Sequence, residues 1–268
     1  MINEEYTKQI KAEFIKCTSG AIERTNKALA TPEKSGGLKP FHSKLLLNEA
    51  IVWSQFERSY STSFGQALIE RVSKLVALAY GAKEAVGQKE TTVELYENQL
   101  SAIEDHLKNI RNKNSGQRGD WEKDIENLMA IEGSGEKKSE RVISDLWYNR
   151  AGLEHFVSIK TVKPNIDQTA QAKKDLLLIK LSNPDSNVFF GLYYNPYGEK
   201  RESYKPKAAA KIFDFTKDEV VLVGKEYWDT IGGDGAYEKI LKIAEDSTVE
   251  STAMINAFAK KHGLEVKL

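Results

Sequence analysis

The spacing of apolar residues changes near residue 140 and divides the chain into two halves. Before that point, apolar positions recur every three or four residues, which is typical of amphipathic helices. The pattern predicts helices over about 6–22, 43–80, 91–112 and 121–131. Small polar residues at 59–65 interrupt the second stretch, so two helices or one bent helix are expected there. Turn-forming residues at 31–40 and 112–120 predict loops.

After residue 140 the pattern is that of strands alternating with helices. Strands at 141–148 and 153–162, separated by NRAG, form an antiparallel hairpin. Asp167 is expected to cap a helix over about 168–181, and the next strand, at 186–194, then runs parallel through a right-handed crossover. Further strands are predicted at 210–215 and 219–224, and further helices at 234–245 and 248–262.

These elements predict an α/β fold whose N-terminal half is largely helical. We divide the chain into a helical part, 1–135, and a strand-containing core with C-terminal helices, 136–268, and interpret the two as one integrated domain. A length of 268 residues allows one large domain with a substantial core.

Composition excludes several classes of protein. Lysine and arginine together number 39, as do aspartate and glutamate, so the whole chain is not a basic nucleic-acid binder. The single cysteine, Cys17, excludes an internal disulfide and indicates a reducing compartment. No apolar run approaches the ~20 residues that a membrane span requires. The opening MINEEYTKQI is not a secretory signal, so we expect a cytoplasmic protein with no membrane partner.

The candidate chemistry lies on the hairpin. Asp145 is on its first strand, and Ser158-Ile159-Lys160 is on its second. Positions 158 and 160 share a face because side chains alternate along a strand, and a tight hairpin brings Asp145 beside Ser158. This arrangement resembles the PD-(D/E)XK nuclease core, a mixed sheet flanked by helices. The resemblance implies that Asp145 binds Mg²⁺ and that Lys160 orients or activates the attacking water. Without it, a strand lysine beside an aspartate is more often a solvated charge pair.

The triplet departs from the nuclease pattern at Ser158, where an acid is usual, and serine is a poor ligand for Mg²⁺. Some related enzymes recruit an acid from the following helix instead, and Asp175 is close to that spacing. Glu57 and Glu70, on the second helical stretch, are rivals. Glu154 shares the face of Lys160 but lies about 13 Å from Ser158, too far for one metal.

Four blocks of sequence resemble the TdeIII-type family of type II restriction endonucleases. They are FERSYSTSFGQ (56–66), SIKTVKPNIDQT (158–169), FFGLYYNPYGE (189–199) and KIFDFTKDEVVLVGKEYWDTIGG (211–233). The resemblance extends from about Phe41 to Tyr237. It implies a Mg²⁺-dependent endonuclease that cuts double-stranded DNA at a short palindrome of GGNCC type. Enzymes that read palindromes are commonly two-fold dimers, so a homodimer is expected.

Polar residues beyond the hairpin are candidates for DNA contact. Lysines near 160–180 and 200–217 meet phosphates, while arginine suits the edge of guanine. The candidates are Lys163, Asn165, Gln168, Asn195, Tyr197, Arg201, Tyr204 and Lys205. The alternatives are helix capping for Asn165 and Gln168, and a solvated loop with tyrosines covering core edges for the others.

Two other functions remain open from the sequence. One is a DNA-repair or structure-specific nuclease with the same core, and the other is a DNA-binding module that has lost activity, for which Ser158 is the argument. Dependence of cutting on Mg²⁺ separates a nuclease from a pure binder, and discrete fragments separate restriction from repair.

Overall fold

The computed structural model describes residues 2–31, 40–112, 114–205 and 209–265. They form two compact units. The helical unit comprises Ile2–Val72 and Glu238–Leu268, and the sheet unit comprises Ser73–Tyr237. The division therefore differs from the expected one at residue 135. None of the described helices is long and apolar enough to cross a membrane.

The helical unit is built from segments at both ends of the chain. Its elements are α1 (Glu4–Ala30), α2 (Pro40–Leu45), α3 (Asn48–Ser63), the π-helical turn η2 (Phe64–Leu68), the start of α4 (Ile69–Ala79), most of α9 (Ala236–Asp246) and α10 (Thr248–Lys261). Val52 of α3 packs with Phe258 and Ala259 of α10 in its core. The interruption expected in the second helical stretch is the turn η2. Most of the loop expected at 31–40 lies outside the described residues.

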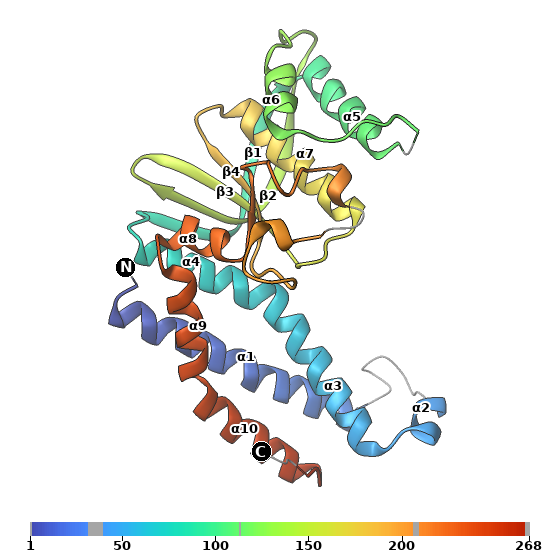
Figure 1. Cartoon of the computed structure of the whole chain (residues 1–268), viewed down its shortest axis with the longest axis vertical. Coiled ribbons are helices and arrows are strands. Elements are labelled where there is room, and N and C mark those ends of the chain that lie inside the picture. The colour runs from blue at the N-terminus through green and yellow to red at the C-terminus, as the bar shows by residue number, and fades with distance from the viewer. Residues whose placement is uncertain (1, 32–39, 113, 206–208, 266–268) are drawn as a thin grey trace. The chain divides into compact units, whose positions relative to one another are not determined.

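A five-stranded mixed sheet with the order β1-β2-β3-β4-β5 is the centre of the other unit (Figure 1). The strands are β1 (Glu84–Tyr96), β2 (Lys137–Arg150), β3 (Leu153–Lys160), β4 (Asn187–Leu192) and β5 (Val221–Val223). The first three pair antiparallel, and β3, β4 and β5 pair parallel. The α/β class, the hairpin and the parallel crossover through α7 (Ile166–Ser182) are confirmed.

Each face of the sheet is covered by its own helices. Helix α7 packs on one face, where Trp147, Phe156 and Phe190 join Leu176 in the main core. Helices α5 (Glu97–Arg111) and α6 (Trp121–Met129) pack against α7 (Figure 1). On the other face, Tyr227 of α8 (Lys225–Gly232) lies against Gly191, where an added Cβ would be 2.5 Å from its ring. The α7 face carries the site described below.

Three expectations need correction: the start of one helix, one strand and one helix cap. The helix expected over 91–112 begins only at Glu97, because the run TTVELY, rich in β-branched residues, belongs to β1. The strand expected at 210–215 is instead the short 3₁₀ helix η4 (Ala209–Lys211) followed by a turn, and Phe213 and Phe215 after the helix pack in the core. Asp167 does not cap α7: Asn165 does.

Candidate active site

The ribbon formed by β1 and β2 is distorted where Gln88 faces Asp145. Val142 and Trp147 contribute to the same core although they are an odd number of residues apart, so the alternation of β2 shifts by one between them. The pairs on either side, Gly87 with Leu146 and Lys89 with Ser144, keep one register, so both strands shift together. Distortions of this kind re-aim a side chain, and here the side chain is Asp145.

Asp145 accepts hydrogen bonds from both neighbouring strands, β1 and β3. Its Oδ2 accepts hydrogen bonds from the backbone N–H of Ile159 at 2.7 Å and from Lys160 Nζ at 2.8 Å. Ser158 Oγ donates to the same oxygen at 3.5 Å. Its Oδ1 accepts from Gln88 Nε2 at 3.3 Å. The side chains of Asp145 and Lys160 remain 18% and 26% exposed, so the pair is open to solvent.

Asp175 approaches the same site from α7. Burial raises the pKa of its carboxyl group, while the hydrogen bond from Gln171 Nε2, 2.8 Å long, and the charges of Lys160 and Lys174 act in the opposite direction. The negative charge of Asp145 raises the pKa further. Asp175 therefore lies within electrostatic range of both Asp145 and Lys160. Its part as a substitute acid stays a prediction.

Glu57 belongs to the helical unit. It is exposed on α3, and its carboxylate accepts a hydrogen bond from Ser61 Oγ at 2.5 Å. Its part in catalysis therefore stays a prediction. Among the described residues, no three histidine, cysteine, aspartate or glutamate side chains form a metal-binding group. A cation between Asp145 and Asp175 would have two carboxylate ligands from this set.

Two of the candidate DNA contacts form the N-terminal cap of α7. Asn165 Oδ1 accepts a hydrogen bond from the backbone N–H of Gln168 at 2.8 Å, and Gln168 Oε1 accepts one from the backbone N–H of Asn165 at 3.3 Å. This is a reciprocal capping box. The structural alternative for these residues is therefore present, although both remain exposed.

The loop after β4 presents a mixed set of candidates. The ammonium group of Lys163 lies 5.5 Å from the centre of the Tyr197 ring, and both residues are exposed. Asn195 shapes the loop, since its Nδ2 donates to the carbonyl of Lys200 at 2.8 Å. Lys205 is exposed. These four residues lie on or near the surface at the end of the strands that carry the site.

Arg201 and Tyr204 are engaged inside the protein. The Arg201 guanidinium donates to the carbonyls of Phe215 and Asp218 and to Glu226, and its side chain is only 16% exposed. Tyr204 is 3% exposed, and its hydroxyl donates to the carbonyl of Val162 at 2.8 Å. Three of the five guanidinium N–H donors of Arg201 therefore already have carbonyl or carboxylate partners, and the reading of a guanine edge by Arg201 stays a prediction.

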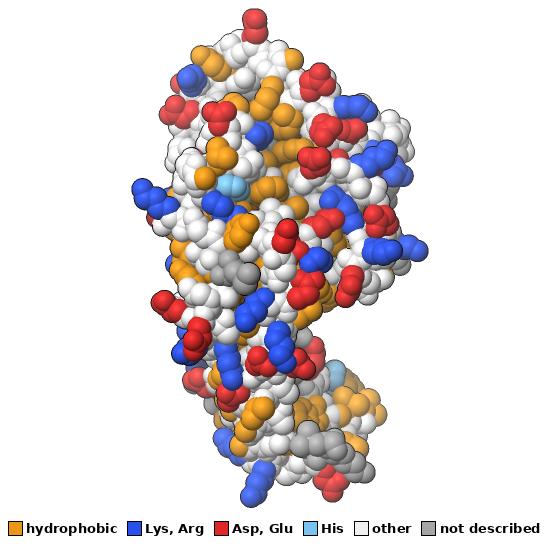
Figure 2. All heavy atoms as spheres, turned by 60° about the vertical axis from the view of Figure 1, so that its left-hand side comes forward, with side chains coloured by type: hydrophobic (Ala, Val, Ile, Leu, Met, Phe, Trp, Pro, Cys, Tyr) orange, Lys and Arg blue, Asp and Glu red, His pale blue; other side chains and the backbone are white. Residues whose placement is uncertain are grey.

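The basic patch expected at 160–180 is largely used within the fold. Lys173 is fully buried and pairs with Asp124, Lys174 pairs with Glu104, and Lys180 donates to two loop carbonyls. On the surface drawn in Figure 2, basic and acidic side chains are interspersed.

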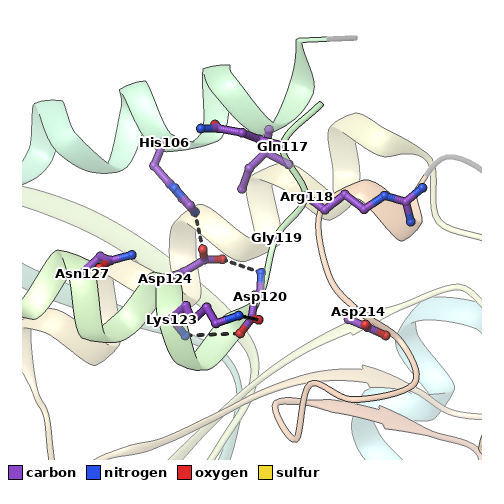
Figure 3. A pocket seen from close by; sticks show the side chains of 10 residues that line it. His106, Gln117, Arg118, Gly119, Asp120, Lys123, Asp124, Asn127 and Asp214 are labelled. Carbon is purple, nitrogen blue, oxygen red and sulfur yellow. Dashed lines mark hydrogen bonds and ion pairs between the residues drawn. The ribbon is translucent and has the colours of Figure 1, made fainter. Parts of the chain in front are cut away.

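The partner of Lys173 belongs to a polar cluster that the sequence does not reveal. Burial acts to raise the pKa of Asp124, but His106 and Lys173 together hold it below its usual value. His106 Nε2 lies 3.1 Å from Asp124 Oδ1 beside a cavity of about 450 Å³ that Arg118 and Lys123 also line (Figure 3). The ion pair between Asp124 of α6 and Lys173 of α7 holds these two helices together and thereby supports the helix that carries Asp175.

Comparisons with known proteins agree over most of the chain. The family model of the type II restriction endonuclease HinfI matches residues 2–248. The type II restriction enzymes HgiCII and HgiEI of Herpetosiphon aurantiacus are 30% and 31% identical to this chain over 232 residues. Each alignment covers 85% of this chain, and 84% and 83% of the respective relative. HgiBI of the same organism is 30% identical over 227 residues.

Proposed function

Because the chain belongs to the HinfI family of type II restriction endonucleases, and is therefore a site-specific endonuclease, we propose that it hydrolyses double-stranded DNA at the site formed by Asp145, Ser158, Lys160 and Asp175. The observation that carries this assignment is the hydrogen bond of 2.8 Å between Lys160 Nζ and Asp145 Oδ2, at a partly exposed position of the sheet. We place the site in the PD-(D/E)XK class.

Type II restriction endonucleases generally use divalent metal ions, and the donor set here fits Mg²⁺. Mg²⁺ is typically held by one or two carboxylates together with water and substrate phosphate. Asp145 and Asp175 would supply the carboxylates. Burial disfavours the ionised form of Asp175 more than its neighbours stabilise it, and a bound cation would offset that cost. When bound, Mg²⁺ supplies positive charge that stabilises the phosphate as negative charge develops on it.

The residues of the chain have separate tasks in the reaction. A water oxygen forms a new bond to phosphorus and releases one proton to solvent, while one backbone P–O bond breaks and the leaving oxygen takes up a proton from solvent. The Lys160 ammonium has three donors and uses one on Asp145, so others can orient the water or a phosphate oxygen. Ser158 is 7% exposed and donates to Asp145, so we assign it to orienting that carboxylate.

Asp175 is our choice for the acid that replaces the one missing at Ser158. Its electrostatic coupling to Asp145 and Lys160 supports it. Glu57 is the alternative, and it would require an approach from the helical unit.

For the DNA face we retain Lys163, Asn165, Gln168, Asn195, Tyr197 and Lys205, and we leave out Arg201 and Tyr204. Exposure of Lys163 and Tyr197 beside the end of β3 supports this choice. Phosphate contacts by the lysines position the duplex, and amide side chains can contact its backbone or bases.

We further propose that the substrate is a short palindrome of GGNCC type, as the TdeIII-type resemblance implies. A palindrome calls for two active sites related by two-fold symmetry, so we propose a homodimer. Cys17, single and buried, fits a reducing cytoplasm.

The experiment that tests the proposed function is digestion of a fully sequenced plasmid in the presence of Mg²⁺, followed by mapping of every end. Discrete fragments whose ends share one short palindrome are expected, with no cutting after chelation of the metal. Random nicking, or digestion from the ends, would reject restriction at a defined site.

A further inference from the structure

Gln88 has a backbone conformation that its residue type does not favour. Among the described residues, Gln88 (φ 51°) and Ala151 (φ 53°) are the non-glycine residues with positive φ. Ala151 lies in the turn between β2 and β3, where that conformation is ordinary, whereas Gln88 lies in the middle of β1. A side chain with a Cβ is strained in this region, and such strain persists where the surrounding structure or function requires it.

This conformation places the amide of Gln88 on the candidate catalytic acid. The pairs on either side show that Gln88 lies opposite Asp145 in the ladder. Its Nε2 donates to Asp145 Oδ1 at 3.3 Å, while Ile159 and Lys160 donate to Oδ2. Hydrogen bonds to both oxygens fix the rotation of a carboxylate more completely than hydrogen bonds to one oxygen alone.

We infer that Gln88 is a positioning residue for the endonuclease reaction: it holds the plane of the Asp145 carboxylate so that Oδ1 is oriented for a divalent cation. The inference rests on the proposed function of Asp145. Glycine would adopt a φ of 51° without strain, but it has no amide to donate. The strained backbone is therefore explained by the hydrogen bond that its side chain makes. Partners that orient a metal-binding group typically change affinity or activity by roughly 10–100-fold.

The test compares two substitutions that relieve the same kind of strain. Gln88→Gly and Ala151→Gly both place glycine at a positive φ, so each is expected to keep or raise the midpoint of thermal unfolding in metal-free buffer. Gln88→Gly is expected to lower single-turnover cleavage by roughly 10–100-fold and to raise the Mg²⁺ concentration for half-maximal rate. Ala151→Gly is expected to cut as the wild type does.

Gln88→Glu provides a second variant of nearly the same size. It keeps the length of the side chain but replaces the N–H donor by an acceptor, so it is expected to lose cleavage as Gln88→Gly does. If Gln88→Gly proves unstable, the cleavage rate of Gln88→Glu tests the positioning role of Gln88 instead.

The inference is overturned if the Gln88 variants cut within about twofold of the wild type, below the effect typical of orienting partners. It is also overturned if Ala151→Gly loses as much activity as Gln88→Gly, since relief of strain would then be the cause. Asp145→Asn is measured in parallel. If Asp145→Asn cuts normally, the proposed function itself is wrong; if it is inactive while the Gln88 variants cut normally, only the role of Gln88 is wrong.

Discussion

Asp175 combines a cost in stability with a proposed gain in function. Because burial raises the pKa of its carboxyl group in the folded protein, the fold favours the protonated form. The ionised form therefore destabilises the protein, and this cost grows as the pH rises through the raised pKa. Below the ordinary pKa range of aspartate, the group is protonated in both states and the cost disappears. A bound cation would offset the same cost at neutral pH.

The first prediction is that Asp175→Asn raises thermal stability at neutral pH but lowers Mg²⁺-supported cleavage by at least roughly 10²-fold, because it removes a metal ligand. The gain in stability should fade as the pH is lowered through the acidic range. Unfolding midpoints at several pH values and single-turnover rates check the two parts. Glu57→Gln is the matched control and should cost much less activity. A severe loss in Glu57→Gln, with normal cutting by Asp175→Asn, would make the helix glutamate the second ligand.

A carboxylate restored at position 158 tests the same assignment from the other side. Ser158 shares the face of Lys160 and contacts Asp145, so an aspartate there would lie beside Asp145. Ser158→Asp in the Asp175→Asn background is expected to recover part of the cleavage. If the double variant is no more active than Asp175→Asn, the exchange of ligands between the two positions is rejected.

At the scale of single residues, strand periodicity was enough to bring Asp145, Ser158 and Lys160 together. Gln88 and Gln171 gave no signal, because their contacts depend on the distortion of the ribbon and on the rotation of α7. The intramolecular partners of Arg201 gave no signal in the sequence either. Its guanidinium suits guanine in the abstract, but tertiary structure supplies carbonyl and carboxylate partners first.

Helix α7 is the element on which most of the account depends. It connects β3 to β4, carries Asp175 toward the site, and begins with the Asn165–Gln168 capping box. Its Lys173 is fixed to Asp124 of α6 on another side of the helix. Loss of its cap would therefore loosen the helix that carries Asp175, the proposed second acid.

The second prediction concerns this cap. Asn165→Ala is expected to lower the free energy of unfolding by about 1 kcal/mol, since one helix N–H loses its partner. Asn165→Asp should keep the cap and add favourable charge at the helix N-terminus. Denaturant unfolding measures the stability of both variants. DNA binding is the second measurement: if Asn165 faces a phosphate, Asn165→Asp weakens binding although the fold is intact. Equal binding by Asn165→Asp and wild type would reduce Asn165 to a structural role.

Most elements with strong periodicity were predictable, and strand β1 is the main exception. The hairpin, α7, β4 and the two C-terminal helices lie close to their expected positions. Strand β1 was misassigned because its exposed positions carry Glu90, Thr92 and Glu94, so its apolar pattern is short and passes directly into α5. Sequence spacing also could not show that β1 pairs with β2, a contact between segments about fifty residues apart.

At the scale of the whole chain, charge balance hides local differences. The net formal charge is zero, yet Lys163, Lys200, Lys205 and Lys217 are exposed in the segments nearest the ends of β3 and β4. Four lysines in each copy give eight in the proposed homodimer. The type II restriction endonuclease assignment is established by relatives along most of the chain, whereas the composition alone argued mildly against DNA.

The third prediction follows from these lysines. If six to ten phosphates are neutralised, affinity for DNA should fall on the order of 10³–10⁵ between 50 and 200 mM salt. Fluorescence anisotropy with Ca²⁺ in place of Mg²⁺ measures binding without cleavage. Lys163→Gln together with Lys205→Gln should reduce the salt slope, whereas the surface substitution Lys8→Gln should not. If the affinity for DNA does not change with salt concentration, the assignment of residues 160–217 to the DNA face is rejected.

The most direct test of the central claim is single-turnover cleavage of a plasmid with a mapped site by wild type, Asp145→Ala and Lys160→Ala, with circular dichroism and thermal unfolding as checks of folding. Each substitution is expected to lower the rate by roughly 10²–10⁴-fold, because the acid and the cationic donor act on the reacting groups themselves. Both variants should remain folded and bind the same site. If either folded variant cuts at nearly the wild-type rate, the reaction is not centred on Asp145 and Lys160.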